Sequence, residues 1–329
     1  MRYPNSLFVL LCLAVQAVAL AGETAWFGSD ALLRGLWTPQ ELRGSPAEAA
    51  AARTAPPVAE PPATPLPSSP LPAALRGSIR SVDLPPGARV LALTFDLCET
   101  ARETAGYAAD VVEALRSHAA RATFFASGKW LTTHPERAAQ LLADPRFELG
   151  GHGWVHRNPR LLDAAGREQE IALTLAAYAR VREGLAARAA ARGLAGEMAR
   201  APAALRLWRF PYGACNAAAL DDLARAGLPA IQWDVVSGDP TPGLAAADMA
   251  REVLRRVRPG SVVVFHANGR GHHTAQALEI ILPELARRGF ALATVSELLA
   301  LGRPRVADTC FGERRSEERR VGKECRSRW

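Results

Sequence analysis

The 329-residue sequence lacks features that would place it in several common protein classes. No glycine-rich phosphate motif follows its first predicted strand, so a bound nucleotide cofactor is not indicated. Its N-terminal apolar stretch, Leu7 to Leu20, is short for a stable transmembrane helix. The length accommodates one α/β barrel with appendages but not two. We therefore expect one catalytic domain, without a nucleotide and without a stable membrane span.

The N-terminus has the organisation of a secretory signal. Arg2 supplies the positive charge, the apolar stretch follows, and Ala19-Leu20-Ala21 gives the small-x-small pattern that signal peptidase cleaves. We predict a signal peptide over residues 1–21 and a secreted or periplasmic mature protein, with an uncleaved anchor as the alternative. Cys12 follows two leucines, which does not indicate a lipoprotein anchor.

Cysteine is scarce, with five residues in the whole chain. An exported protein matures in an oxidising compartment where disulfides persist. Setting aside Cys12 in the signal and Cys325 in the terminal segment leaves Cys98, Cys215 and Cys310, an odd number. Because Cys98 and Cys215 both follow predicted strand ends, we predict that these two form a disulfide. Two buried thiols and metal ligation by Cys98 remain as alternatives.

The last fifteen residues carry a large share of the net positive charge. Residues 315–329 hold six basic and three acidic side chains, which supply +3 of the formal net charge of +7. This segment has no apolar period, and it resembles the translation of a sequencing-library adapter, so we interpret it as an artefact. The alternative is a basic tail that binds nucleic acid or an anionic membrane. We predict no nucleic-acid partner, and a short native tail over residues 306–314.

Composition divides the remainder into a spacer and a domain. Residues 22–84 include a stretch, 55–72, dominated by Pro, Ala and Ser, which predicts an extended, semi-rigid spacer. Residues 85–305 alternate short β-rich runs with longer helical segments, a pattern typical of a parallel sheet covered by helices. The predicted strands are 90–95, 122–126, 147–150, 207–210, 230–233, 261–265 and 290–295. A closed or nearly closed barrel of the α/β class fits this pattern better than an open sheet.

Residues that can perform chemistry follow four of these strands. Asp96, His152, Arg209 and His266 lie at or just past the strand ends, and His156 follows His152 at i+4. In a β/α barrel these ends converge on the face that carries the active site. The two histidines are spaced to bind one divalent ion, and a carboxylate would complete the usual three protein ligands. The alternatives are a helix N-cap for Asp96, a surface anion site for Arg209 and structural roles for the histidines.

The motifs occur in a recognisable order. TFD at 94–96, the His-x-x-x-His pair, RFPY at 209–212, WDVVSGD at 233–239 and a final strand ending in His266 resemble the NodB-like polysaccharide deacetylases of carbohydrate esterase family 4. The resemblance spans about residues 90–299. It implies a distorted (β/α)7 TIM-like barrel and a divalent metal ion, most simply zinc.

The resemblance also implies a role for each matching residue. Asp96 would be the catalytic base, and His152 and His156 would bind the metal. Arg209 would orient the base, and the backbone N–H of Tyr212 would help to hold the oxyanion. His266 would be the general acid, oriented by Asp239, with Asp234 as the alternative orienting carboxylate.

Two positions depart from the family pattern. Leu97 replaces the second aspartate of TFDD, the usual third metal ligand, and an aliphatic side chain cannot coordinate a metal. We predict that Glu99 supplies the ligand, with Asp96 or water as alternatives. Pro240 replaces a tryptophan that often follows the aspartate of the fourth motif, which would alter the pocket for the acyl methyl group.

The expected activity is hydrolysis of N-acetyl groups on hexosamines of an acetylated glycan, such as peptidoglycan, an exopolysaccharide or a chitooligosaccharide. The enzyme would then be a hydrolase of carbon–nitrogen bonds other than peptide bonds. Two alternatives remain open. One is an O-acetyl esterase or non-sugar amide hydrolase on the same scaffold, and the other is a non-catalytic glycan-binding module of the cell envelope.

Overall fold

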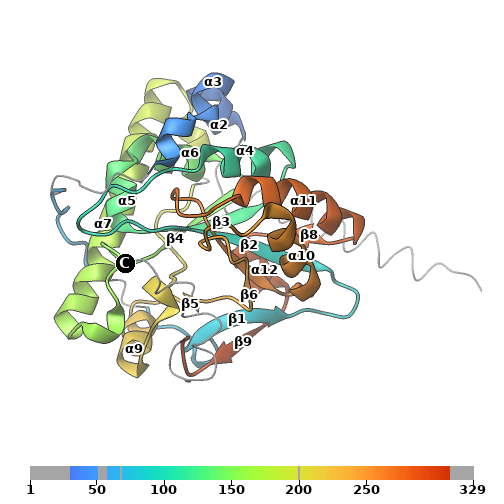
Figure 1. Cartoon of the computed structure of the whole chain (residues 1–329). Helices are drawn as coiled ribbons and strands as arrows, with labels where there is room; N and C mark the ends of the chain where they lie inside the picture. Colours follow the sequence, from blue (N-terminus) through green and yellow to red (C-terminus); the bar gives the residue numbers. More distant parts are fainter. Residues whose placement is uncertain (1–29, 51–57, 67–68, 199–200, 312–329) are drawn as a thin grey trace, which may run out of the picture.

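A computed structural model describes residues 30–50, 58–66, 69–198 and 201–311 (Figure 1). The predicted signal peptide and the suspected adapter segment lie outside these ranges. Within them, no helix is both long and apolar enough to cross a membrane.

The centre of the molecule is a parallel sheet in which every long strand is almost wholly buried. Its order is β4-β3-β2-β7-β6, and β8 pairs with the start of β2. A buried strand has no solvent face, which explains why these sequences are continuously apolar instead of alternating. The strands are β2 (Val90–Leu97), β3 (Ala122–Ala126), β4 (Phe147–Gly151), β6 (Val235–Val236), β7 (Val262–His266) and β8 (Ala291–Leu292).

The sheet curves into a distorted barrel. Parallel bridges connect Gly151 to Trp208 and Trp208 to Ala230, so the pairing continues from β4 to β5 (Ala230–Ile231). The predicted strand 207–210 is reduced to the single residue Trp208, which takes part in both bridges. Residues 232–234 interrupt the pairing before β6, so the ladders of the described residues form no continuous closed sheet. The prediction of a distorted barrel is thus confirmed.

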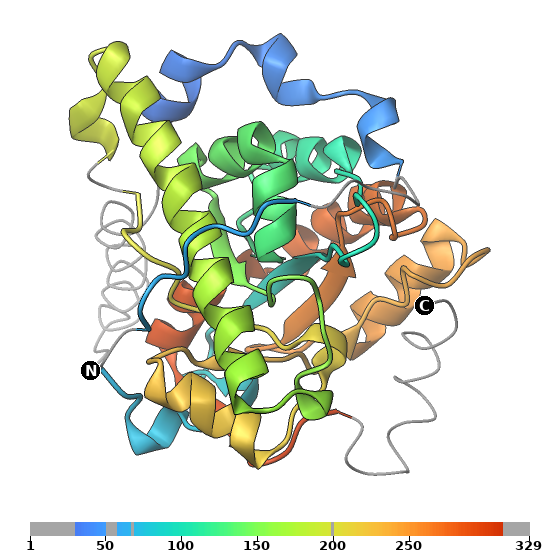
Figure 2. The ribbon, with the colours of Figure 1, turned by 90° about the vertical axis from the view of Figure 1, so that its left-hand side faces the viewer.

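Helices cover the sheet on its outer faces (Figure 1). Several begin at side-chain caps: Asp163 accepts from Gly166 N at 2.8 Å, and Asn216 accepts from Ala219 N at 3.0 Å. The longest, α7, runs across the molecule (Figure 2) and packs against α5 and α9. The covering helices are α4 (Ala109–Ser117), α5 (Gly128–Thr133), α6 (Pro135–Ala143), α7 (Ala164–Ala191), α8 (Ala195–Met198), α9 (Ala217–Arg225), α10 (Ala246–Arg256), α11 (Thr274–Arg287) and α12 (Val295–Leu301).

The N-terminal helices are part of the domain. Helix α2 (Asp30–Leu36), helix α3 (Pro39–Arg43) and a 3₁₀ turn η1 (Pro46–Ala49) lie against α4, α6 and α7 (Figure 2). Leu32, Leu33, Leu36 and Trp37 are buried in the main core, and burying such side chains stabilises the fold by about 1.5–3 kcal/mol each. Arg137 pairs with Glu48 at 2.7 Å. The prediction of a spacer is therefore wrong for residues 30–49.

The folded domain also extends beyond both of its predicted boundaries, residues 85 and 305. Strand β1 (Ser78–Asp83) lies before the predicted start at residue 85, and it pairs with β5 and antiparallel with β9 (Arg303–Ala307). These contacts make 78–83 and 303–307 parts of one small sheet. A short polar strand carries little sequence signal when its partners are distant in the chain.

The disulfide joins Cys215 to Cys310, with their Cα atoms 5.3 Å apart. The predicted Cys98–Cys215 bond is wrong, and Cys98 is buried outside any disulfide. The physical reason is the position of the C-terminal segment: β9 brings it beside the loop that follows Gly213, where Phe311 N donates to Gly213 O at 3.1 Å. The predicted tail 306–314 is thus anchored to the domain as far as residue 311.

Candidate active site

The site lies where the central strands end. Asp96 is the penultimate residue of β2, and His266 is the last residue of β7. The parallel register places these two residues directly opposite each other. His152 follows β4 by one residue, and Arg209 follows the Trp208 bridge. Four strand ends therefore bring together the residues that the sequence predicts, as expected for the carboxyl face of a β/α barrel.

Asp96 and Arg209 form a buried ion pair. Arg209 Nη1 donates to Asp96 Oδ1 at 2.7 Å, and the guanidinium group is fully buried. Arg209 also donates to the carbonyl oxygen of Ile231 and lies over the ring of Phe125, 4.1 Å from its centroid. Burial alone would raise the pKa of Asp96, but Arg209, with His152 and His266, brings it below its ordinary value. The carboxylate is thus ionised and oriented with one oxygen left for other partners.

His152 is fixed in one orientation by the backbone. Its Nδ1 lies 2.8 Å from the carbonyl oxygen of Arg209, an acceptor, so Nδ1 carries the proton. Nε2 is then the lone-pair nitrogen. This buried atom makes no hydrogen bond within the described chain and lies 3.6 Å from Asp96 Oδ2. Burial also lowers the pKa of His152, which keeps the ring neutral.

His156 reaches the same place through a tight loop and not through a helical turn. Its φ of +57° is unusual for a residue with a side chain and brings the ring 4.9 Å from that of His152. Burial holds the pKa of His156 well below its ordinary value. Backbone strain of this kind costs of order 1–3 kcal/mol and is found mainly at functional sites.

Glu170 of α7 holds the loop that carries the two histidines. Its Oε2 accepts from Trp154 N at 2.8 Å and from Val155 N at 3.3 Å, and its Oε1 accepts from Arg157 Nε at 2.6 Å. Glu170 is absent from the site residues that the sequence predicts. The available signal was a carboxylate at the start of an otherwise apolar stretch of a long helix, where charged residues are rare unless paired.

Tyr212 lies beside the histidines. It has a φ of +60°, and its ring centroid is 4.4 Å from that of His156. Gly213, also at positive φ, follows it, and a Cβ there would meet Trp233 at 2.7 Å. The RFPYG motif thus forms a turn that lies beside His156 in the site. That the Tyr212 N–H holds an oxyanion stays a prediction.

His266 is oriented by Asp239. The His266 Nδ1 atom lies 2.9 Å from Asp239 Oδ1, and the His266 backbone N–H donates to Oδ2 at 2.7 Å. Ser237 and Thr274 donate to the same carboxylate, which is fully buried. Burial alone would lower the pKa of His266, but Asp239 raises it above the ordinary value. The alternative partner, Asp234, instead binds Ser261 and Val262 N at the opposite end of β7.

The contacts that the structure gives Glu99 lie on the loop after β2 and on α5. Its Oε2 accepts from Ala105 N at 3.0 Å and from Thr133 Oγ1 at 2.9 Å, and Oε1 lies 3.5 Å from Lys129 Nζ. The structure therefore does not support the prediction that Glu99 is a metal ligand: its carboxylate organises the loop after β2. Cys98 takes the place beside the histidines. The ligand atoms of Cys98, His152 and His156 lie within 4.8 Å of one another.

These donors fit a divalent metal. The Nε2 atom of His152 is a buried acceptor without a donor among the described residues, and its other nitrogen is held by a carbonyl, the usual arrangement around a metal-binding histidine. The Asp96 carboxylate, held by Arg209, and the His266 imidazole, held by Asp239, flank these donors. The arrangement can perform metal-assisted hydrolysis of an acyl group.

Comparison with known proteins identifies the family. A sequence model of polysaccharide deacetylases matches residues 83–231. A chitooligosaccharide deacetylase of Azorhizobium caulinodans is 30% identical over 196 residues, covering 55% of this chain and 83% of the relative. A peptidoglycan-N-acetylglucosamine deacetylase of Bacillus cereus is 27% identical, covering 66% and 91%. The chain belongs to the polysaccharide deacetylase family, and the resemblance found in the sequence is confirmed.

Solved structures share the fold. A peptidoglycan N-acetylglucosamine deacetylase superposes with a TM-score of 0.57 at 22% identity, covering 69% of this chain and 95% of the other. A pseudoenzyme of carbohydrate esterase family 4 from Bacillus anthracis gives 0.53 at 21% identity, covering 68% and 69%. At these identities the likeness shows a common fold and assigns no activity.

Proposed function

We propose that this protein is a metal-dependent deacetylase that hydrolyses N-acetyl groups of hexosamine residues in a cell-envelope or extracellular polysaccharide. The observation that carries the proposal is the pairing of Asp96 with Arg209 and of Asp239 with His266 on adjacent strands. A glycan-binding site needs no such acid and base. The relatives named as deacetylases of chitooligosaccharide and peptidoglycan support this choice of substrate.

Asp96 acts as the base. Arg209 occupies Oδ1, so Oδ2, on the side of His152, is the oxygen that accepts the proton of the attacking water. His152 and His156 hold a divalent metal, for which we propose zinc. Such an ion would supply polarisation of the acetyl carbonyl and would lower the pKa of a bound water toward about 7.

His266 acts as the acid. Its raised pKa favours the protonated imidazole, and with Nδ1 engaged by Asp239, Nε2 carries the proton that passes to the leaving amine. The Tyr212 N–H completes the support of the oxyanion. The turn at 211–213 places that residue next to His156.

The proposed location is outside the cytoplasm, in the periplasm or the medium, where acetylated glycans lie. The proposal rests on the signal-like residues 1–21 and agrees with a disulfide in the folded domain.

Acetate release tests the function. The purified protein is incubated with chitooligosaccharides, peptidoglycan fragments and O-acetylated xylan, with and without a chelator, and the metal-free protein is then reloaded with zinc. We expect release from the hexosamine substrates, loss with the chelator and recovery with zinc. Release from xylan alone would indicate an esterase. Binding to glycans without release from any substrate would indicate a binding module.

A further inference from the structure

Strand geometry places Cys98 on the catalytic side of β2. Side chains alternate along a strand, so Asp96 and Cys98 share one face and Leu97 takes the other. The contacts agree: Leu97 is buried in the main apolar core, whereas the Cys98 sulfur lies within 4.8 Å of ligand atoms of Asp96 and His266 as well as of the two histidines. Leucine at 97 is therefore compatible with a complete metal site, because a donor is available one residue later.

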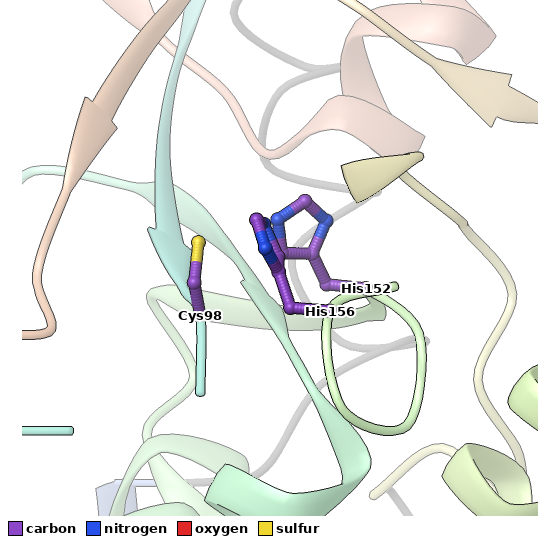
Figure 3. A group of neighbouring side chains, drawn as sticks. All are labelled: Cys98, His152 and His156. Atoms are coloured by element: carbon purple, nitrogen blue, oxygen red, sulfur yellow. The ribbon is translucent and has the colours of Figure 1, made fainter. Parts of the chain in front are cut away.

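Three donors from two segments converge at this point. Figure 3 shows the Cys98 side chain facing the rings of His152 and His156, with the cysteine at the end of β2 and the histidines on the loop after β4. All three residues are buried, with exposed fractions of 1–4%. His152 presents a nitrogen that makes no hydrogen bond within the described ranges, and its ring cannot turn away without breaking the bond to Arg209 O.

Hydrogen bonds from neighbouring polar groups hold the backbone around Cys98. The Asn268 amide donates to Cys98 O at 2.8 Å, and Asn268 is fully buried. On either side, Ser127 N donates to Leu97 O at 3.1 Å and Glu99 N donates to Ser127 Oγ at 3.0 Å. Partners of this kind restrict the motion of a ligand and raise its affinity for a metal.

We propose that the metal centre of this protein is a Cys98–His152–His156 site, in which a thiolate replaces the carboxylate usual in the family. The inference rests on the proposed metal dependence and deepens it. A thiolate with two imidazoles favours zinc or cobalt over manganese and magnesium, which prefer oxygen ligands. Binding converts the Cys98 thiol to a thiolate and releases its proton to solvent. Asp96 then serves as base alone.

Cobalt substitution tests the ligand set directly. The full chain with Cys12→Ser and Cys325→Ser, which removes the cysteines outside the described residues, is freed of metal and loaded with Co²⁺. We expect about one cobalt per chain and a thiolate-to-cobalt charge-transfer absorption in the near ultraviolet. Cobalt bound without that absorption, or no binding of cobalt or zinc, would overturn the proposal.

Two substitutions identify the donor. Cys98→Ser is expected to lose the absorption and most of the bound metal, with thermal unfolding and circular dichroism showing that it folds. Asp96→Asn, which keeps the size of the neighbouring carboxylate, is expected to retain both. Loss of the metal in Asp96→Asn with retention in Cys98→Ser would assign the third ligand to Asp96 instead. If Cys98→Ser fails to fold, the absorption of the parent protein decides the question.

The outcomes separate this inference from the proposed function. If the protein shows the absorption but releases no acetate, the thiolate site is supported and the deacetylase proposal is refuted. If the protein releases acetate in a zinc-dependent way but shows no thiolate absorption, the proposed function is supported and the assignment of Cys98 as a ligand is refuted.

Discussion

The two halves of the candidate site are built differently. The proposed acid–base half, Asp96–Arg209 and Asp239–His266, consists of two carboxylates, each paired with a basic side chain; Asp96, Arg209 and Asp239 are buried, and His266 is partly exposed. The proposed metal half, Cys98, His152 and His156, consists of one thiol and two imidazoles just past strand ends, on loops held by side chains from elsewhere. Buried charge pairs tolerate little change, because removing one partner leaves an uncompensated charge. A metal ligand can change when a neighbouring residue of the same segment offers another donor.

The largest expected effect is on the metal half. His152→Ala should lose the bound metal and reduce kcat/KM by roughly 10⁴-fold, since the metal supplies several kcal/mol of charge stabilisation. Metal content and acetate release are measured on the same sample. His118→Ala, a partly exposed histidine paired with Glu279, is the control and should change neither. Activity without metal would contradict the division into two halves.

Asp96→Asn breaks the acid–base half while leaving the ligands in place. General base catalysis contributes about 10²–10⁴-fold, so we expect kcat to fall by about 10³-fold with the metal retained. Asparagine keeps an oxygen for Arg209, which limits the effect on stability. Kinetics at saturating substrate and metal analysis check this prediction. Metal loss in this variant would place Asp96 in the metal half.

Asp239→Asn should keep His266 in the site but reduce the fraction of His266 that is protonated. The Asp239 charge raises the pKa of His266, so its loss lowers that pKa, and the proton is then lost at lower pH. We expect kcat to fall by about 10²-fold at neutral pH and the alkaline limb of the kcat profile to move to lower pH. Asp234→Asn is the matched control, because Asp234 binds the other end of β7. An unshifted limb in Asp239→Asn would refute its role as the partner of the acid.

The smallest expected effect concerns Glu170, which supports the loop that carries His152 and His156. Glu170→Gln keeps an acceptor for the loop N–H groups but loses the ion pair with Arg157, and we expect metal affinity to fall by about tenfold. Competition with a chelator measures the change. Glu168→Gln, at an exposed position of the same helix, should have no effect. Equal effects of the two changes would show that Glu170 does not position the ligands.

Local patterns predicted the parts of the site that follow apolar strands. β3 lies at its predicted residues, and Asp96, His152, Arg209 and His266 meet because parallel strands end on one face. Asp239 was distinguishable from Asp234 only through the family motif. Glu170 and Asn268 carried too weak a signal, because their roles depend on contacts between segments distant in the chain.

The sequence by itself determined the barrel class, the catalytic order of motifs and the family, because each depends on short apolar runs and on the residues directly after them. Tertiary structure alone decided the partner of Cys215, the placement of the N-terminal helices and the orientation of Glu99. In each case the deciding contact joins residues far apart in sequence: Cys310 for Cys215, Glu48 with Arg137, and Lys129 for Glu99. Only this packing leaves Cys98 beside the two histidines.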